Sequence, residues 1–143
     1  MDKISMFKEE YFFLSNFYLC SVDYDGMTYP SVEAAYQAAK TVDKTLRKEF
    51  THISSGRAKK LGRSVDLRPD WEKIKEDVMY TCLKSKFSDP FLRRKLLATG
   101  KKHLVEENYW KDTYWGVYNG EGKNRLGELL MKLRSEIRKE IKK

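Results

Sequence analysis

Apolar positions recur at helical spacing along most of the chain beyond residue 31. Between residues 31 and 40, Val32, Ala35, Tyr36 and Ala39 form one apolar stripe, because side chains three or four positions apart share a helix face. The same pattern predicts helices over residues 32–40, 44–53, 55–62, 70–87, 90–99 and 124–139. Capping residues, an Asp-Pro pair and glycines mark where these helices begin or end. We expect the leucine-rich stripe of the last helix to be core. The predicted fold class is therefore mainly α.

The first thirty residues follow a different pattern, in which aromatic side chains are frequent and the helical period is absent. Asp25 and Gly26 stand between two short runs, residues 22–24 and 27–29, and both residue types tolerate a positive φ. This predicts a tight β-hairpin, and with it a small N-terminal sheet. Pro30 ends the pairing, and Ser31 can cap the helix that follows.

Residues 109–123 fit neither a helix nor a regular strand. The segment YWKDTYWGVYNGEGK combines five aromatic residues with three glycines. Such a composition predicts a long ordered loop. Because that much aromatic surface is costly to expose to water, we expect the loop to fold over a site.

Charge adds a constraint on the partner. The 143 residues contain 29 Lys and Arg against 21 Asp and Glu, for a net charge of +8. Residues 1–40 hold three basic and six acidic side chains, so that segment carries −3 and the remainder carries +11. A positive excess of this kind favours phosphate-bearing partners.

Several classes of protein are excluded at this stage. Every apolar run is interrupted by charges well before about 18 residues, so we expect no membrane span and a cytoplasmic protein. Cys20 and Cys82 lack CxxC spacing, and with only two histidines a metal site is not expected. Both thiols are predicted to be buried or inert, and no cofactor is indicated.

Four motifs are more specific than composition. They are LSNF at residues 14–17, YPSVEAAYQAAK at residues 29–40, the tryptophan-initiated helix at 71–87, and the segment from WG to LLMKLR at residues 115–134. In this order they resemble the NADAR or YbiA-like family of N-glycosidases. The resemblance implies a single helical domain over residues 1–143 and cleavage of the bond between a ribose anomeric carbon and a nitrogen. Family substrates include ribosylamino-pyrimidine phosphates of riboflavin synthesis and ADP-ribose on guanine in DNA.

The residues suited to this chemistry are two carboxylates. Cleavage of an N-glycosidic bond passes through an oxocarbenium-like state, so a carboxylate near C1 and a second group that assists the leaving nitrogen are needed. Glu33 is the candidate for the first role and Asp112, just before the YWG motif, for the second. The structural alternatives are a capping glutamate for Glu33 and an Asx turn for Asp112.

The sequence offers further residues as substrate-binding candidates beside Glu33 and Asp112. Gln37 and Lys40 follow Glu33 at i+4 and i+7. Gln37 could read a base edge or a ribose hydroxyl. Lys40 could hold a phosphate, and the structural alternative is a solvated lysine at the end of the helix. Trp71 is a stacking platform or a core residue. The remaining candidates are Asn16 and Phe17 of the LSNF motif, Trp115 and Gly116 of the aromatic loop, and Asn124, which is also a candidate helix cap.

The sequence also departs from the family pattern. Ala34 follows the motif glutamate where many relatives have His or another polar residue, and Val117-Tyr118 replaces a glycine and an acidic residue. These departures leave the natural substrate open. The leading hypothesis is an N-glycosidase acting on a ribosylated, nucleotide-like substrate, which includes ADP-ribosylated DNA. The alternatives are a non-catalytic NAD or ADP-ribose-binding module and a helical domain that binds DNA through its charge.

Overall fold

The computed structural model describes residues 2–142, which fold into helices joined by loops and two small sheets. The mainly α fold class is confirmed. The chain divides into two compact units. Unit 1 contains the chain ends, up to Ser15 and from Pro90 onward, and unit 2 runs from Asn16 to Asp89. A single domain over residues 1–143 stays a prediction.

Unit 2 begins with the predicted hairpin. Strands β2 (Val22–Tyr24) and β3 (Met27–Tyr29) pair antiparallel, with Val22 opposite Tyr29 and Tyr24 opposite Met27. Asp25 and Gly26 both have a positive φ, of 48° and 87°, as a two-residue hairpin loop requires. The sequence prediction for this segment is confirmed.

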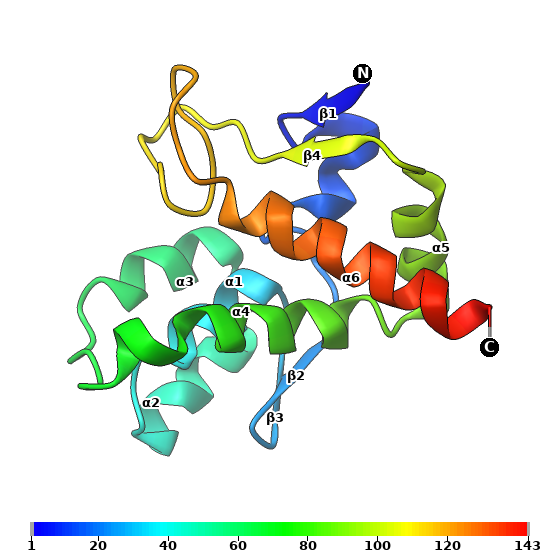
Figure 1. Ribbon diagram of the computed structural model, residues 1–143. Coiled ribbons are helices and arrows are strands. Elements are labelled where there is room, and N and C mark those ends of the chain that lie inside the picture. The colour runs from blue at the N-terminus through cyan, green and yellow to red at the C-terminus, as the bar shows by residue number, and fades with distance from the viewer. Residues whose placement is uncertain (1, 143) are drawn as a thin grey trace. The chain divides into compact units, whose positions relative to one another are not determined.

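Four α-helices complete unit 2 (Figure 1). They are α1 (Val32–Ala38), α2 (Lys44–Glu49), α3 (Ser55–Gly62) and α4 (Trp71–Lys86), with a short 3-10 helix, η2 (Phe50–His52), after α2. Helix α1 packs against both α3 and α4, and all seven of its residues are buried. Its alanines allow this close approach because they present little volume. Where one helix was predicted over residues 44–53, the last turn tightens into the 3-10 form.

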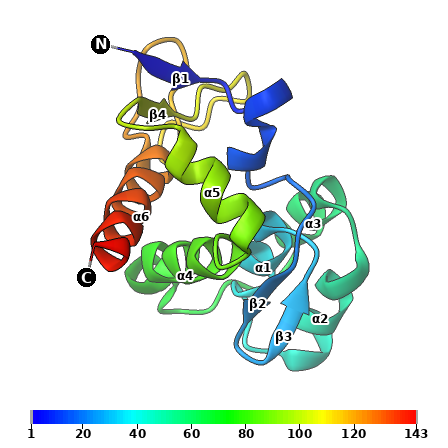
Figure 2. The same ribbon diagram turned by 90° about the vertical axis from the view of Figure 1, so that its right-hand side faces the viewer.

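Unit 1 contains α5 (Pro90–Ala98), α6 (Arg125–Ile141) and the 3-10 helix η1 (Glu9–Leu14). Strands β1 (Lys3–Ser5) and β4 (His103–Val105) pair in parallel, as Figure 2 shows, with Ile4 opposite Leu104. This pairing was not predicted, because three-residue strands about a hundred residues apart leave no local pattern. The apolar stripe of α6 is core as predicted, with Leu126, Leu129, Leu130, Leu133 and Ile137 all buried.

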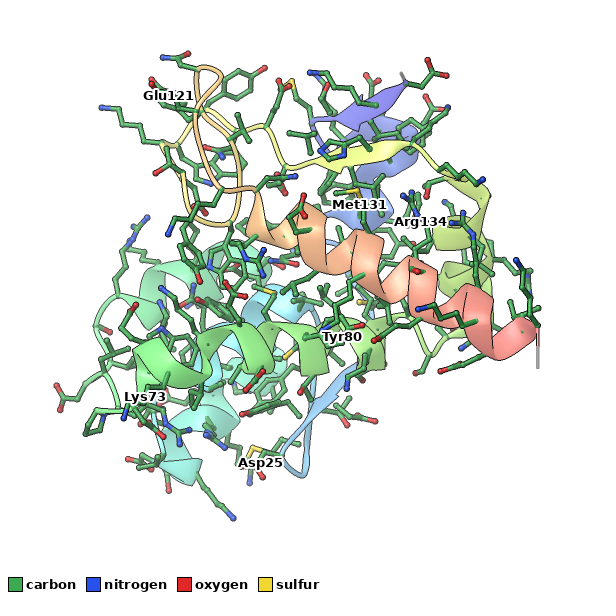
Figure 3. All side chains as sticks on the ribbon, viewed as in Figure 1. Asp25, Lys73, Tyr80, Glu121, Met131 and Arg134 are labelled. Carbon is green, nitrogen blue, oxygen red and sulfur yellow. The ribbon has the colours of Figure 1, made fainter. Side chains whose placement is uncertain are left out.

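The aromatic segment between β4 and α6 is an ordered loop, as predicted. Glu107 bridges Val117, Tyr118 bridges Glu121, and the Lys123 amide donates to the Thr113 carbonyl at 2.8 Å. Figure 3 labels Glu121 at the outer end of this loop in unit 1, and Asp25 at the tip of the hairpin in unit 2. Backbone pairing therefore holds the loop in one shape without a regular sheet.

Among residues 2–142, no helix has the length and apolar character needed to cross a membrane. Within the same part of the chain, no group of three His, Cys, Asp or Glu side chains is arranged to hold a metal ion.

Candidate active site

The first turn of α1 carries the candidate carboxylate. Ser31 caps this helix, since its hydroxyl oxygen accepts a hydrogen bond from the Ala34 amide at 3.0 Å. The Glu33 amide donates at 3.0 Å to the carbonyl of Asn16, so the LSNF motif is tied to the start of α1. Glu33 is only 8% exposed. The helix therefore presents a buried carboxylate in its first turn.

Gln37 forms a side-chain hydrogen bond with Glu33. Its Nε2 donates to Glu33 Oε2 at 2.6 Å, one helical turn away. The other amide atom, Gln37 Oε1, is buried and has no hydrogen-bond partner among the described residues. That oxygen lies against Gly62 of α3, where an added Cβ would be 2.0 Å from it. Gln37 is thus clamped between Glu33 and Gly62, and its contacts are those of a residue that holds the carboxylate.

Lys40 ends the same row, just after α1. Its pKa is lowered chiefly by burial, with nearby Arg63 acting in the same direction and Glu33 opposing. Lys40 Nζ lies 5.7 Å from the centre of the Tyr36 ring. The opposing influence of the Glu33 carboxylate on the pKa of Lys40 places the two side chains near each other, as expected for residues on one helix face. Glu33, Gln37 and Lys40 are therefore brought together.

The LSNF motif contributes two further candidates. Asn16 Nδ2 donates to the sulfur of Met79 at 3.6 Å, whereas Asn16 Oδ1 is buried and has no partner within the described residues. Phe17 is 37% exposed, its carbonyl accepts from the Ser55 hydroxyl at 3.0 Å, and Lys59 Nζ lies 5.9 Å from its ring centre. The structure therefore places Asn16 beside Glu33, through the backbone bond between them, and Phe17 beside α3.

Trp71 and Ala34 are both buried. The Trp71 ring, 4% exposed, lies 5.1 Å from the Tyr36 ring at an interplanar angle of 59°. This contact is the core role that the sequence left open, and stacking on a ligand stays a prediction. Ala34 has no exposed surface. Its position inside unit 2 means that the departure from the family pattern falls on a packed face of α1.

Asp112 lies in unit 1, in the aromatic loop. Its Oδ1 accepts hydrogen bonds from the amides of Tyr114 and Trp115, at 3.0 and 2.9 Å. Asn108 holds the same turn: its Oδ1 accepts from the Asp112 amide at 3.0 Å and its Nδ2 donates to the Asp112 carbonyl at 2.9 Å. The Asx turn, which the sequence offered as the structural alternative, is therefore present. The catalytic role of Asp112 stays a prediction.

The other candidates of unit 1 lie in or next to this loop. The Trp115 ring lies 4.9 Å from that of Tyr114, edge to face. Gly116 is required for packing, since an added Cβ would be 2.2 Å from the Glu106 carbonyl oxygen. Asn124 precedes α6 with a φ of 53°, and its side chain makes no capping bond. Asn124 thus stands at the predicted N-cap position of α6, but its side chain does not cap the helix: both ends of its amide bind the backbone around β4, at Glu106 and Leu104.

Sequence reasoning missed two residues that shape these segments. Gly62 looked like a helix end, yet it is the surface against which Gln37 lies. Asn108 was not among the candidate residues, yet it organises the aromatic loop. The spacing of Ala58 and Gly62, both small and four residues apart, was a signal for a close helix contact, because it leaves one face of α3 without bulk. Nothing local marked Asn108.

Comparison with known proteins identifies the family of this chain. The model of the NADAR domain matches residues 5–138. The N-glycosidase YbiA of Shigella boydii is 43% identical over 134 residues, which cover 90% of this chain and 83% of the relative. A riboflavin biosynthesis protein of Vibrio vulnificus is 37% identical over 134 residues, covering 90% of this chain and 36% of the relative.

A solved structure is similar as well. The NMR structure of the Escherichia coli protein YbiA matches with a TM-score of 0.86 and 40% identity, over 97% of this chain and 86% of that one. The family model and the relatives span both units and include the segments that carry the candidate residues. The chain is a homologue of N-glycosidases and belongs to the NADAR family.

Proposed function

We propose that this protein is an N-glycosidase that hydrolyses the ribose C1–N bond of a phosphorylated, ribosylated, nucleotide-like substrate. The observation that carries the proposal is the buried Glu33 carboxylate, held by Gln37 at 2.6 Å and coupled to the half-buried ammonium of Lys40. A buried carboxylate with a fixed orientation suits the stabilisation of charge at C1. The similarity to N-glycosidase YbiA supports the reaction class.

The proposed reaction is a hydrolysis. The C1–N bond breaks, positive charge develops on the ribose, and the oxygen of a water molecule forms the new bond to C1. Glu33 stabilises that charge or takes a proton from the attacking water, and the leaving nitrogen gains a proton from an acid, for which Asp112 is the candidate. Lys40 supplies positive charge toward a phosphate of the substrate.

Two substrate types fit this chemistry. The names of relatives from Vibrio vulnificus and Zea mays, both riboflavin biosynthesis proteins, support a ribosylamino-pyrimidine phosphate. The positive excess of the chain supports ADP-ribose attached to guanine in DNA. Both present a ribose joined to nitrogen and at least one phosphate, so the same carboxylate can act on either.

The decisive experiment replaces Glu33 by Gln. The amide keeps an oxygen that can accept from Gln37, so the fold and ligand binding should persist, while turnover falls by about 10²–10⁴-fold. Both substrate types are incubated with each protein, and chromatography measures the released base and sugar phosphate. Glu72→Gln is the matched control, because Glu72 is an exposed first-turn glutamate of α4. Equal turnover of both variants would refute the role of Glu33.

A wild-type protein that binds ADP-ribose saturably and releases no product from either substrate would identify a binding module and overturn the proposal. For Asp112 the informative change is Asn, which keeps the oxygen that accepts from Tyr114 and Trp115. If Asp112 donates the proton, turnover falls about a hundredfold while the melting temperature stays unchanged. Unchanged turnover would leave Asp112 with the Asx turn alone.

A further inference from the structure

Helix α3 is basic along its whole length. Residues 50–65, which include it, contain four Lys or Arg side chains and neither Asp nor Glu. Arg57, Lys60 and Arg63 are exposed, and Lys59 is half-buried. A helix with this charge attracts anions, but charge by itself does not indicate where an anion would bind.

The packing of α3 decides which of its cations face the candidate carboxylate. Ala58 and Gly62 are buried, and Gly62 lies against the side chain of Gln37. The neighbouring row contains Ser55, Lys59 and Arg63, four residues apart, so these three share a face. Ser55 and Lys59 both contact Phe17. The residue before it, Asn16, accepts a hydrogen bond from the Glu33 amide through its carbonyl. This row of α3 therefore borders the segments that hold Glu33.

Lys40 and Arg63 form a pair of like charges in this region. Arg63 is close enough to Lys40 to lower the pKa of the lysine. Within residues 2–142, neither side chain has a carboxylate within ion-pair distance. Two neighbouring cations without an ion-pair partner repel each other, and a bound anion would relieve that repulsion. Arg63 adds a planar group that can donate two hydrogen bonds to one phosphate.

We infer that Lys40, Lys59 and Arg63 form a phosphate-binding subsite at the junction of α1 and α3, which holds the phosphate or diphosphate of the substrate beside Glu33. The inference rests on the proposed function, because the phosphate belongs to the ribosylated substrate. Glu33 is the carboxylate of this region, and it lies in the first turn of α1, seven residues before Lys40.

The experiment measures binding rather than turnover. Dissociation constants of inorganic pyrophosphate, ribose 5-phosphate and ADP-ribose are determined by calorimetry for the wild-type chain and its variants. We expect Arg63→Ala to weaken all three by about tenfold, and Lys59→Ala by a smaller factor. Arg57→Ala and Lys60→Ala are matched controls, because they remove the same charges from other faces of α3, and should change binding less than twofold. Arg63→Lys should restore part of the affinity.

The binding and turnover results distinguish failure of the phosphate subsite from failure of the proposed function. If Arg63→Ala and Arg57→Ala bind pyrophosphate equally well, or the wild type binds none of the three probes, the subsite is refuted. If binding depends on Arg63 while no substrate is cleaved, the proposed function fails and the subsite stands. Melting temperatures equal to that of the wild type confirm that the exposed positions were changed without unfolding the chain.

Discussion

Gly62→Ala tests whether α3 controls the orientation of the candidate carboxylate. The added Cβ would lie 2.0 Å from Gln37 Oε1 and 2.7 Å from Gln37 Cδ, distances that real atoms do not adopt. Gln37 is 6% exposed, so its amide cannot swing freely into solvent. We expect the amide to be displaced and its 2.6 Å bond to Glu33 to be lost.

The magnitude follows from two opposing effects. Loss of a buried hydrogen bond to a charged group costs about 1.5–3 kcal/mol. Replacing glycine by alanine in a helix contributes up to about 1 kcal/mol in the other direction. The free energy of unfolding should therefore fall by about 1–2 kcal/mol, which lowers the melting temperature by about 3–6 °C. Because Glu33 loses its positioning partner, kcat should fall by about 10–100-fold.

The matched control is Gly56→Ala, in the same helix. An added Cβ there meets no atom within 4 Å, so this variant should be as stable as the wild type or more stable by up to about 1 kcal/mol. Urea unfolding measures the stability of both variants, and steady-state kinetics on the cleaved substrate measures their turnover. If Gly62→Ala matched Gly56→Ala in both measurements, Gln37 would not be positioned by Gly62.

Three other predictions concern single side chains. Arg47 is 4% exposed and donates to Asp25 at 2.7 Å and to the Thr41 carbonyl at 2.8 Å. Arg47→Ala should therefore lower the free energy of unfolding, measured in urea, by about 2–4 kcal/mol. As a control, Arg57→Ala at an exposed position should change it by no more than about 0.5 kcal/mol. Burial raises the pKa of the Cys82 thiol to about 12, so a thiol reagent at pH 8 should label Cys82 only after the chain unfolds. Labelling of Cys82 in the native chain would contradict its burial. Burial lowers the pKa of Lys40, so the protonated amine destabilises the folded chain, and Lys40→Met should be more stable than the wild type at neutral pH. The difference in the free energy of unfolding should vanish as the pH rises through the folded pKa toward 10.5. A difference that does not depend on pH would refute this prediction.

Much of the helical fold and the hairpin could be predicted from the sequence, because their signals are local. The stripe of α6, the cap at Ser31 and the Asp25-Gly26 turn each depend on residues within one or two turns of each other. The candidate residues Glu33, Gln37 and Lys40 followed from one motif, because they are spaced along one predicted helix, residues 32–40. These predictions needed no knowledge of which elements pack together.

The tertiary structure decided what those residues contact. Gln37 was a candidate reader of the substrate, and that role stays a prediction; the packing of α3 on α1 places it between Gly62 and the carboxylate. Asn124 was a candidate cap, and the proximity of β4 instead engages both ends of its amide. Similarly, β1 and β4 pair across about a hundred residues. Sequence by itself determined the α-helices and the hairpin, since both depend on near neighbours, and it supplied the candidate residues. Only the tertiary structure determined which residues contact one another, because contacts between distant segments depend on how the whole chain folds.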